Sequence, residues 1–123
     1  MGIGTIAFRL ALIAGWVFVL ALSVTAVREM GFDAAGDFYF GDFAHPWRAQ
    51  FNGDFGMHLL LVAAWMVYRT KGLVLGLLSG LLAICLGGVF TLAYLLVVSI
   101  RAKGDMRQVL LGARAGDPAT TGF

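Results

Sequence analysis

Charged residues and cysteines are both scarce in this chain of 123 residues. Only 13% of the residues are charged and the net charge is +2, whereas 60% are hydrophobic. Ordinary globular domains carry about 25% charged residues, so the composition indicates a membrane domain and argues against nucleic-acid binding. Cys85 is the only cysteine, which excludes an intramolecular disulfide. Inside an apolar run, Cys85 is expected to be a small buried side chain.

Three apolar runs predict an all-α integral membrane protein, a small bundle of three transmembrane helices forming one domain over residues 1–123. The expected spans cover residues 8–28, 48–69 and 72–100, since about 20 mostly apolar residues cross about 30 Å of hydrocarbon. The third run is longer than a bilayer requires, so we expect it to tilt or project.

The first run has an alternative interpretation as a secretory signal peptide. Arg9 would then be its charged region, residues 11–22 its apolar core, and residues 24–26 a small-residue cleavage site. We favour a membrane span bracketed by Arg9 and Arg28.

Acidic and aromatic residues alternate in a loop over residues 29–47, before a helix that we expect to begin near Pro46. Glycines at 31, 36 and 41 exclude a long helix in this loop. We favour a loop that lies among the lipid headgroups, with its rings embedded and its carboxylates in contact with water. A docking surface for a partner is a compatible alternative. The candidate interface residues are Phe38, Tyr39, Phe40, Phe43 and Trp47.

The distribution of Lys and Arg predicts an orientation in the membrane. With three spans, the N-terminus and the turn at residues 69–71 share one side with three basic residues, whereas the aromatic loop and the C-terminal tail share the other side with six. Positive charge favours the cytoplasm, which predicts a bacterial inner-membrane protein with its N-terminus outside and its C-terminus inside. The tail, residues 103–114, has the spacing of a basic amphipathic helix on the inner leaflet.

Glycines at four-residue spacing mark the third run. Gly72, Gly76 and Gly80, continued by Gly88, would form one glycine-zipper face on a helix and allow another backbone to approach closely. Packing against the other spans of the same chain is the favoured interpretation. A subunit interface, with a second copy or with other membrane subunits, is the alternative.

Polar residues recur every four positions in the second run, where Gln50, Asp54 and His58 share one helical face. An acid within a membrane costs at least about 2.5 kcal/mol, so this face is the main functional candidate. We favour structural pairing of Asp54 and His58, with each other or with a neighbouring helix. The alternatives are a proton or cation path, axial ligation of a haem or chlorophyll-type pigment by His58, and a later helix start with Asp54 as the N-cap.

Residue sets with catalytic or metal-binding spacing are absent from the sequence. Ser23, Ser79 and Ser99 lie in apolar runs without a partner acid or base, and no phosphate-binding loop or Cys/His cluster occurs. We therefore expect no enzyme, no metal, and no cofactor other than the alternative pigment at His58.

A set of short motifs runs through residues 45–112: a Pro-Trp pair, an Asp-aromatic pair, a Trp-x-x-Tyr-basic ending, and then a Gly and a Tyr before a Leu-rich tail. In this respect the chain resembles an uncharacterised family of small bacterial and plant membrane proteins, catalogued as a domain of unknown function. The resemblance implies three spans and a shared Asp54, and it implies no activity. His58 and the glycines at 72–80 depart from the family's pattern. The matching residues are Pro46-Trp47, Asp54-Phe55, Trp65, Tyr68-Arg69, Gly87 or Gly88, Tyr94 and Leu110-Leu111.

Together these features predict a non-enzymatic membrane protein that acts through helix–helix contacts, as an accessory or assembly subunit of a larger membrane complex. One alternative is an oligomeric component that handles protons or cations through Asp54 and His58. A second is a tetrapyrrole-binding subunit with His58 as the axial ligand. The expected partners are the lipid bilayer and other membrane subunits or further copies of the chain.

Overall fold

The computed structural model describes residues 2–41 and 44–116, and all secondary structure in these ranges is helical. The expected all-α class is therefore confirmed. In chain order the elements are α1 (Ile3–Met30), α2 (Asp33–Gly36), the π-helical turn η1 (Asp37–Gly41), α3 (Pro46–Arg69), α4 (Leu73–Leu86), α5 (Gly88–Arg101), α6 (Met106–Leu111) and the 3-10 turn η2 (Gly112–Arg114).

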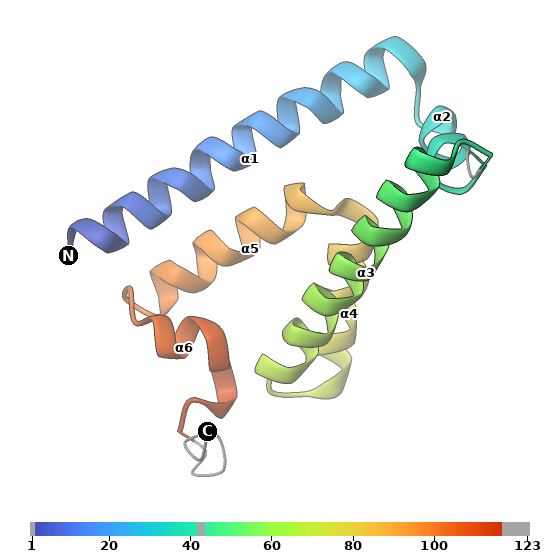
Figure 1. The fold of residues 1–123 in the computed structure, drawn as a ribbon. Helices are drawn as coiled ribbons and strands as arrows, with labels where there is room; N and C mark the ends of the chain where they lie inside the picture. Colours follow the sequence, from blue (N-terminus) through green and yellow to red (C-terminus); the bar gives the residue numbers. More distant parts are fainter. Residues whose placement is uncertain (1, 42–43, 117–123) are drawn as a thin grey trace.

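Two antiparallel helix pairs form the body of the molecule, α1 with α5 and α3 with α4 (Figure 1). Val19 of α1 lies against Gly88 at the start of α5. Arg9, near the start of α1, donates hydrogen bonds to the hydroxyl and the carbonyl of Ser99, at 3.2 and 3.1 Å. In the second pair, Gly80 of α4 lies against α3. The two pairs diverge from the end that carries α2, which gives the ribbon an open V shape (Figure 1).

The chain turns sharply between α4 and α5, so the single helix expected over residues 72–100 is wrong. Gly87 has φ 58° and ψ −134°, a backbone conformation that residues with a Cβ avoid. Its amide donates to the carbonyl of Ala83 at 2.8 Å and thereby closes α4. Each of the two helices has 14 residues, about 21 Å at 1.5 Å per residue, and so falls short of a bilayer's hydrocarbon thickness of about 30 Å.

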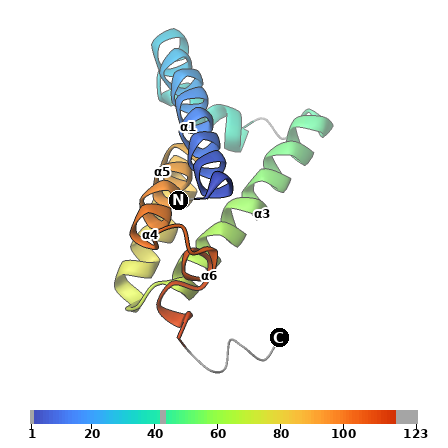
Figure 2. The same ribbon diagram turned by 90° about the vertical axis from the view of Figure 1, so that its left-hand side faces the viewer.

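Because the third run doubles back, the end of α5 lies at the same end of the molecule as the start of α1 and the turn between α3 and α4. The C-terminal tail follows it there, and α6 packs on the end of α3 (Figures 1 and 2). Arg69 of α3 donates to the carbonyl of Val109, at 2.9 Å, and Trp65 donates to that of Leu110, at 2.8 Å. The expected grouping of the tail with the aromatic loop is therefore wrong.

This arrangement concentrates positive charge at one end of the molecule, which we call the basic end. The opposite end carries α2 and η1, with Glu29, Asp33 and Asp37, and only Arg28 and Arg48 as basic residues. The basic end holds seven of the nine Lys and Arg residues: Arg9, Arg69, Lys71, Arg101, Lys103, Arg107 and Arg114.

Among the described helices, only α1 is long and apolar enough to cross a membrane, and a signal sequence near the N-terminus has the same properties. Its 28 residues extend over about 42 Å. Leu12 is its only buried residue, and large side chains such as Phe18 face outward, with 64% of the surface exposed. A helix that is apolar on nearly all sides and so little covered is typical of a membrane span or of a signal sequence.

The buried core is small and lies in the seams between packed helices. Met66, Ser99 and Val109 are its largest fully buried side chains. Cys85, expected to be buried, is instead exposed. The reason is that α4 packs against α3 through its glycine-bearing face and leaves its outer face uncovered.

The helix α3 begins at Pro46, as the sequence predicted. His45 is the N-cap, and its Nδ1 accepts a hydrogen bond from the amide of Arg48 at 3.4 Å, while Pro46 occupies the first helical position. These residues place Asp54 well inside the helix. The alternative in which a later start makes Asp54 an N-cap is therefore wrong.

Candidate functional site

Asp54 and His58, predicted to share one face of the second run, contact each other on α3. Nδ1 of His58 lies 3.2 Å from Oδ1 of Asp54 and 2.9 Å from the carbonyl oxygen of the same residue. The side chains of His58 and Asp54 are 71% and 57% exposed. Across residues 2–41 and 44–116, these contacts are the only hydrogen bonds or ion pairs that either side chain makes.

The geometry of the pair defines what the imidazole can do. Two oxygens of Asp54 lie close to Nδ1 of His58, which favours the tautomer with its proton on Nδ1. Nε2 is then the acceptor nitrogen. It is able to take up a proton, accept a hydrogen bond from another helix, or ligate a metal.

Large apolar side chains surround this pair on the surface of α3. Phe51, Met57 and Leu61 are 61%, 59% and 66% exposed, and at their spacing they share the helical surface of Asp54 and His58. We call this surface the α3 outer face, and it comprises Gln50, Phe51, Asp54, Met57, His58 and Leu61. It therefore combines an uncovered polar pair with an apolar surround.

The aromatic loop folds into short helical turns that pack on the start of α3. Phe38 and Tyr39 make an edge-on contact at 5.2 Å, and Tyr39 stacks on Phe55 of α3 at 6.4 Å between ring centroids. The side chain of Asn52 is buried and donates to the carbonyl of Phe38 at 3.1 Å. Of the candidate interface rings, Tyr39 thus packs on α3, and Phe38 packs on Tyr39.

Two other candidate rings, those of Phe40 and Trp47, are exposed. Phe40 and Trp47 are 83% and 74% exposed, so both are accessible to lipid or to a partner. Phe43 lies outside the described residues.

The glycines of the third run are divided between two seams and one turn. Gly76 and Gly80 are buried between α4 and α3, where a Cβ at Gly80 would lie 3.2 Å from the Cβ of Ala63. Gly88 faces α1 instead, and Gly72 precedes α4 with φ 99°. A single zipper face along all four positions is therefore wrong, because the chain turns between α4 and α5.

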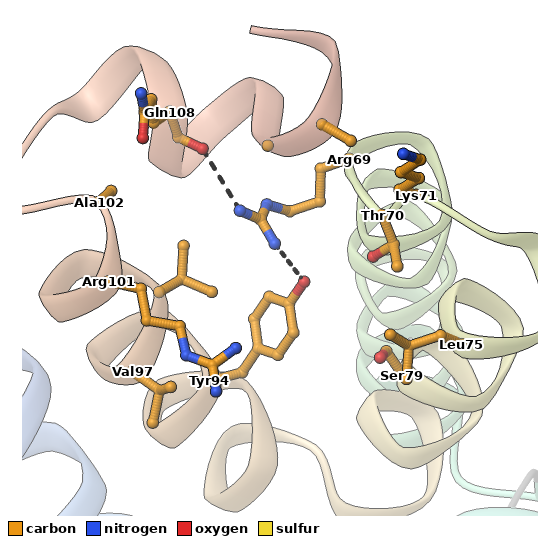
Figure 3. A pocket seen from close by; sticks show the side chains of 13 residues that line it. Arg69, Thr70, Lys71, Leu75, Ser79, Tyr94, Val97, Arg101, Ala102 and Gln108 are labelled. Carbon is orange, nitrogen blue, oxygen red and sulfur yellow. Dashed lines mark hydrogen bonds between the residues drawn. The ribbon is translucent and has the colours of Figure 1, made fainter.

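Arg69, at the end of α3, forms a polar network that sequence reasoning did not single out as a site. Its Nε donates to the carbonyl of Val109 at 2.9 Å, and its terminal nitrogens donate to the hydroxyl of Tyr94 at 2.7 Å and to the carbonyl of Gln108 at 3.3 Å (Figure 3). The guanidinium carbon lies 5.7 and 5.5 Å from the ring centroids of Trp65 and Tyr94. The network joins α3, α5 and α6.

A cleft of about 650 Å³ opens beside this network at the basic end. Arg69, Lys71 and Arg101 line it, together with the polar side chains of Ser79 and Tyr94 (Figure 3). No carboxylate is among the described residues that line it. The cleft therefore carries a positive charge that is not balanced within its own walls.

Four motif residues of the family resemblance meet in this network: Trp65, Arg69, Tyr94 and Leu110. The rings of Trp65 and Tyr94 make an edge-on contact at 6.0 Å. Pairing them from sequence was out of reach because Trp65 and Leu110 are 45 positions apart and Arg69 and Tyr94 are 25 apart.

Comparison of the chain with family models, curated proteins and solved structures found no match. Within the described ranges, no three His, Cys, Asp or Glu side chains come together in a group that could hold a metal ion. The α3 outer face and the cleft at the basic end are therefore the two candidate functional surfaces.

Proposed function

We propose that the chain is an integral membrane protein in which α1 and α3 cross the bilayer and the α4–α5 pair inserts from the basic end. The 28 residues of α1 and the 24 of α3 extend about 42 and 36 Å, long enough for about 30 Å of hydrocarbon. Whereas α1 is also apolar enough to cross by itself, α3 is not, so the proposal requires its polar residues, Asp54 and His58 among them, to be covered by another subunit. The concentration of Lys and Arg supports a cytoplasmic basic end. In a bacterial inner membrane, α6 and the start of α1 would then both face the cytoplasm.

We further propose that the protein is an accessory or assembly subunit that docks on a larger membrane complex through the α3 outer face. The observation that carries this proposal is the Asp54–His58 pair, exposed on a helix whose neighbouring side chains are apolar. In hydrocarbon a carboxylate and an imidazole need polar partners. A helix of another subunit that offers a hydrogen-bonding side chain would supply them.

Replacing both polar residues tests this docking. In an Asp54→Leu/His58→Leu variant, association should weaken about 3- to 30-fold, because an interhelical hydrogen bond contributes about 0.6–2 kcal/mol in membranes. The full chain is extracted in mild detergent, run on a native gel, and the co-eluting proteins are identified by mass spectrometry. The expected result is a stoichiometric membrane partner with the natural chain, and less of that partner and more free subunit with the variant.

A matched control removes polar groups that already have partners within their own helix. The hydroxyls of Ser23 and Thr25 donate to carbonyls four positions earlier in α1, at 2.8 and 2.9 Å. A Ser23→Ala/Thr25→Val variant should therefore keep the partner. If the natural chain elutes without a stoichiometric partner protein, or if the Asp54/His58 variant retains as much of the partner as the natural chain does, the accessory-subunit proposal is wrong.

The contact between Asp54 and His58 also favours one alternative, an oligomer that conducts protons or cations along the α3 outer face. A carboxylate beside an imidazole is a common arrangement for proton exchange. In this case the chain would elute as a homo-oligomer, and Asp54→Asn would abolish a pH-dependent flux in liposomes while leaving the helical content unchanged.

The second alternative, a tetrapyrrole-binding subunit, is supported by the orientation of His58. Metal-ligating histidines usually donate their other ring N–H to a carboxylate or a carbonyl, and Asp54 provides both beside Nδ1. A pigment bound at Nε2 would give the purified protein a visible absorbance band, and His58→Ala would remove that band.

A further inference from the structure

The cleft at the basic end has more hydrogen-bond donors than the described chain uses. A guanidinium has five N–H groups, and three of those on Arg69 donate to Val109, Tyr94 and Gln108. Two N–H groups of Arg69 are therefore left for a further acceptor. Because the network fixes the guanidinium on three sides, these donors are held in place before a ligand arrives.

Two hydroxyls add to this donor set. The hydroxyl oxygen of Tyr94 accepts from Arg69 at 2.7 Å, and among the described residues its own hydrogen has no acceptor. Ser79, on the α4 wall, also lines the cleft and makes no hydrogen bond through its hydroxyl within the same residues. Figure 3 shows Ser79 on α4, across from Tyr94, whose hydroxyl points toward Arg69.

Charge and shape indicate the class of ligand. Lys71 and Arg101 add two cations to that of Arg69, and no described carboxylate in the cleft neutralises them. Leu75 and Val97 form an apolar wall of the same cleft. Leu75 is 58% exposed and Val97 is 50% exposed. Donors and cations beside an exposed apolar wall suit an amphiphilic anion better than a small inorganic ion.

Resting on the membrane placement proposed above, we propose that this cleft binds the phosphate group of an anionic membrane lipid. Arg69 and the Tyr94 hydroxyl would donate to the phosphate, Lys71 and Arg101 would add positive charge along the cleft, and the apolar wall would lie along the glycerol and upper acyl chains. Arg69 donates in a fixed orientation, and the other two cations contribute mainly charge. Basic clefts between helices on the cytoplasmic side of a membrane are typical sites for such headgroups. The proposal is independent of the partner on the α3 outer face.

Short-chain phosphatidylglycerol titrated into the detergent-solubilised full chain tests the site. A Lys71→Gln/Arg101→Gln variant should raise the apparent dissociation constant about 30-fold, because two cations are lost while the Arg69 network that joins α3, α5 and α6 is kept. Short-chain phosphatidylcholine, whose headgroup is neutral overall, should bind more weakly than phosphatidylglycerol to the natural chain and should respond little to the substitutions.

The matched control removes the same charge at the same end of the molecule, outside the cleft. Lys103 and Arg107 are exposed and do not line the cleft, so Lys103→Gln/Arg107→Gln should change the dissociation constant by less than about twofold if the site is specific. An equal loss of affinity in both double variants would show that the lipid senses only the overall charge and would overturn the proposal.

A separate titration distinguishes a lipid from a free phosphate ion. Inorganic phosphate and glycerol phosphate carry the anion without the acyl chains, so they should bind more weakly than phosphatidylglycerol and compete with it. If either binds as tightly as the lipid, the apolar wall contributes nothing and the assignment to a membrane lipid is wrong.

Discussion

Glycines, which lack a Cβ atom, allow helices of this chain to approach one another closely. Gly80 brings α4 against α3, and Gly112 does the same for the end of α6, where a Cβ would collide with the carbonyl oxygen of Arg69. Gly112 also has φ 55°, which residues with a Cβ adopt only at a cost. Both glycines are thus required by contacts between helices rather than by the flexibility of a loop.

Replacing Gly80 by leucine should therefore loosen the α3–α4 pair. A Cβ at this position already lies 3.2 Å from the Cβ and 3.3 Å from the carbonyl oxygen of Ala63, and overpacking of this kind costs about 1–3 kcal/mol. The measurement is the free energy of unfolding in detergent, followed by circular dichroism. Gly53→Leu is the control, since a Cβ at Gly53 meets nothing within 4 Å. If the two variants are equally stable, α4 does not pack closely on α3 at Gly80.

At the scale of residues, the sequence predicted contacts within one helix but not contacts between helices. The four-residue spacing of Asp54 and His58 predicted their contact because both lie on one helix. Arg69 and Tyr94 are 25 positions apart, and no local rule joins residues across a turn whose geometry is unknown. The cleft, which depends on that join, was therefore absent from the sequence-based hypotheses.

At the scale of elements, the turn between α4 and α5 has the largest consequence. A long uncharged run predicts one continuous helix, and the pair Gly87-Gly88 inside it is the local signal that a turn was available. Gly88 also lets Val19 of α1 approach, since a Cβ there would lie 3.5 Å from a Val19 methyl group. The turn forms because each half of the run packs on a different partner helix.

Gly87→Ala should destabilise the fold by about 1–3 kcal/mol, because its backbone conformation is one that residues with a Cβ rarely adopt. Space is not the cause, since the nearest atom to a Cβ at this position is the Cζ of Phe55, at 3.8 Å. Thermal unfolding of the detergent-solubilised protein measures the effect. Gly56→Ala, in the interior of α3 with open space around it, should be neutral or stabilising by up to about 1 kcal/mol. If the unfolding temperature changes equally in both variants, the α4–α5 turn does not depend on the backbone conformation of Gly87.

At the scale of the whole molecule, the turn changes the orientation that we propose: the tail stays on the cytoplasmic side, while the N-terminus joins it there and the aromatic loop moves to the opposite side. Counted over three spans, the basic residues were divided three against six. With the third run doubled back, seven of nine lie at one end and the acids of residues 29–37 at the other. The same positive-inside argument therefore leads to a different orientation once the path of the chain is known.

Cysteine labelling measures this path directly. In a Cys85→Ser background, Lys71→Cys and Lys103→Cys should react with a membrane-impermeant thiol reagent from the same, cytoplasmic side, and Glu29→Cys from the opposite side. A third full span would instead place positions 71 and 103 on opposite sides. Reaction of these two positions from opposite sides would therefore contradict the doubled-back arrangement.

The sequence alone determined the helical class, the start of α3 at Pro46, and the shared face of Asp54 and His58, because these depend on apolar periodicity and on residues within about one helical turn. The tertiary structure decided the turn at Gly87, the division of the glycines between two seams, and the placement of Arg69, Lys71 and Arg101 along one cleft. Those features depend on which helix packs against which. That choice comes from contacts between residues far apart in the chain, which periodicity does not encode.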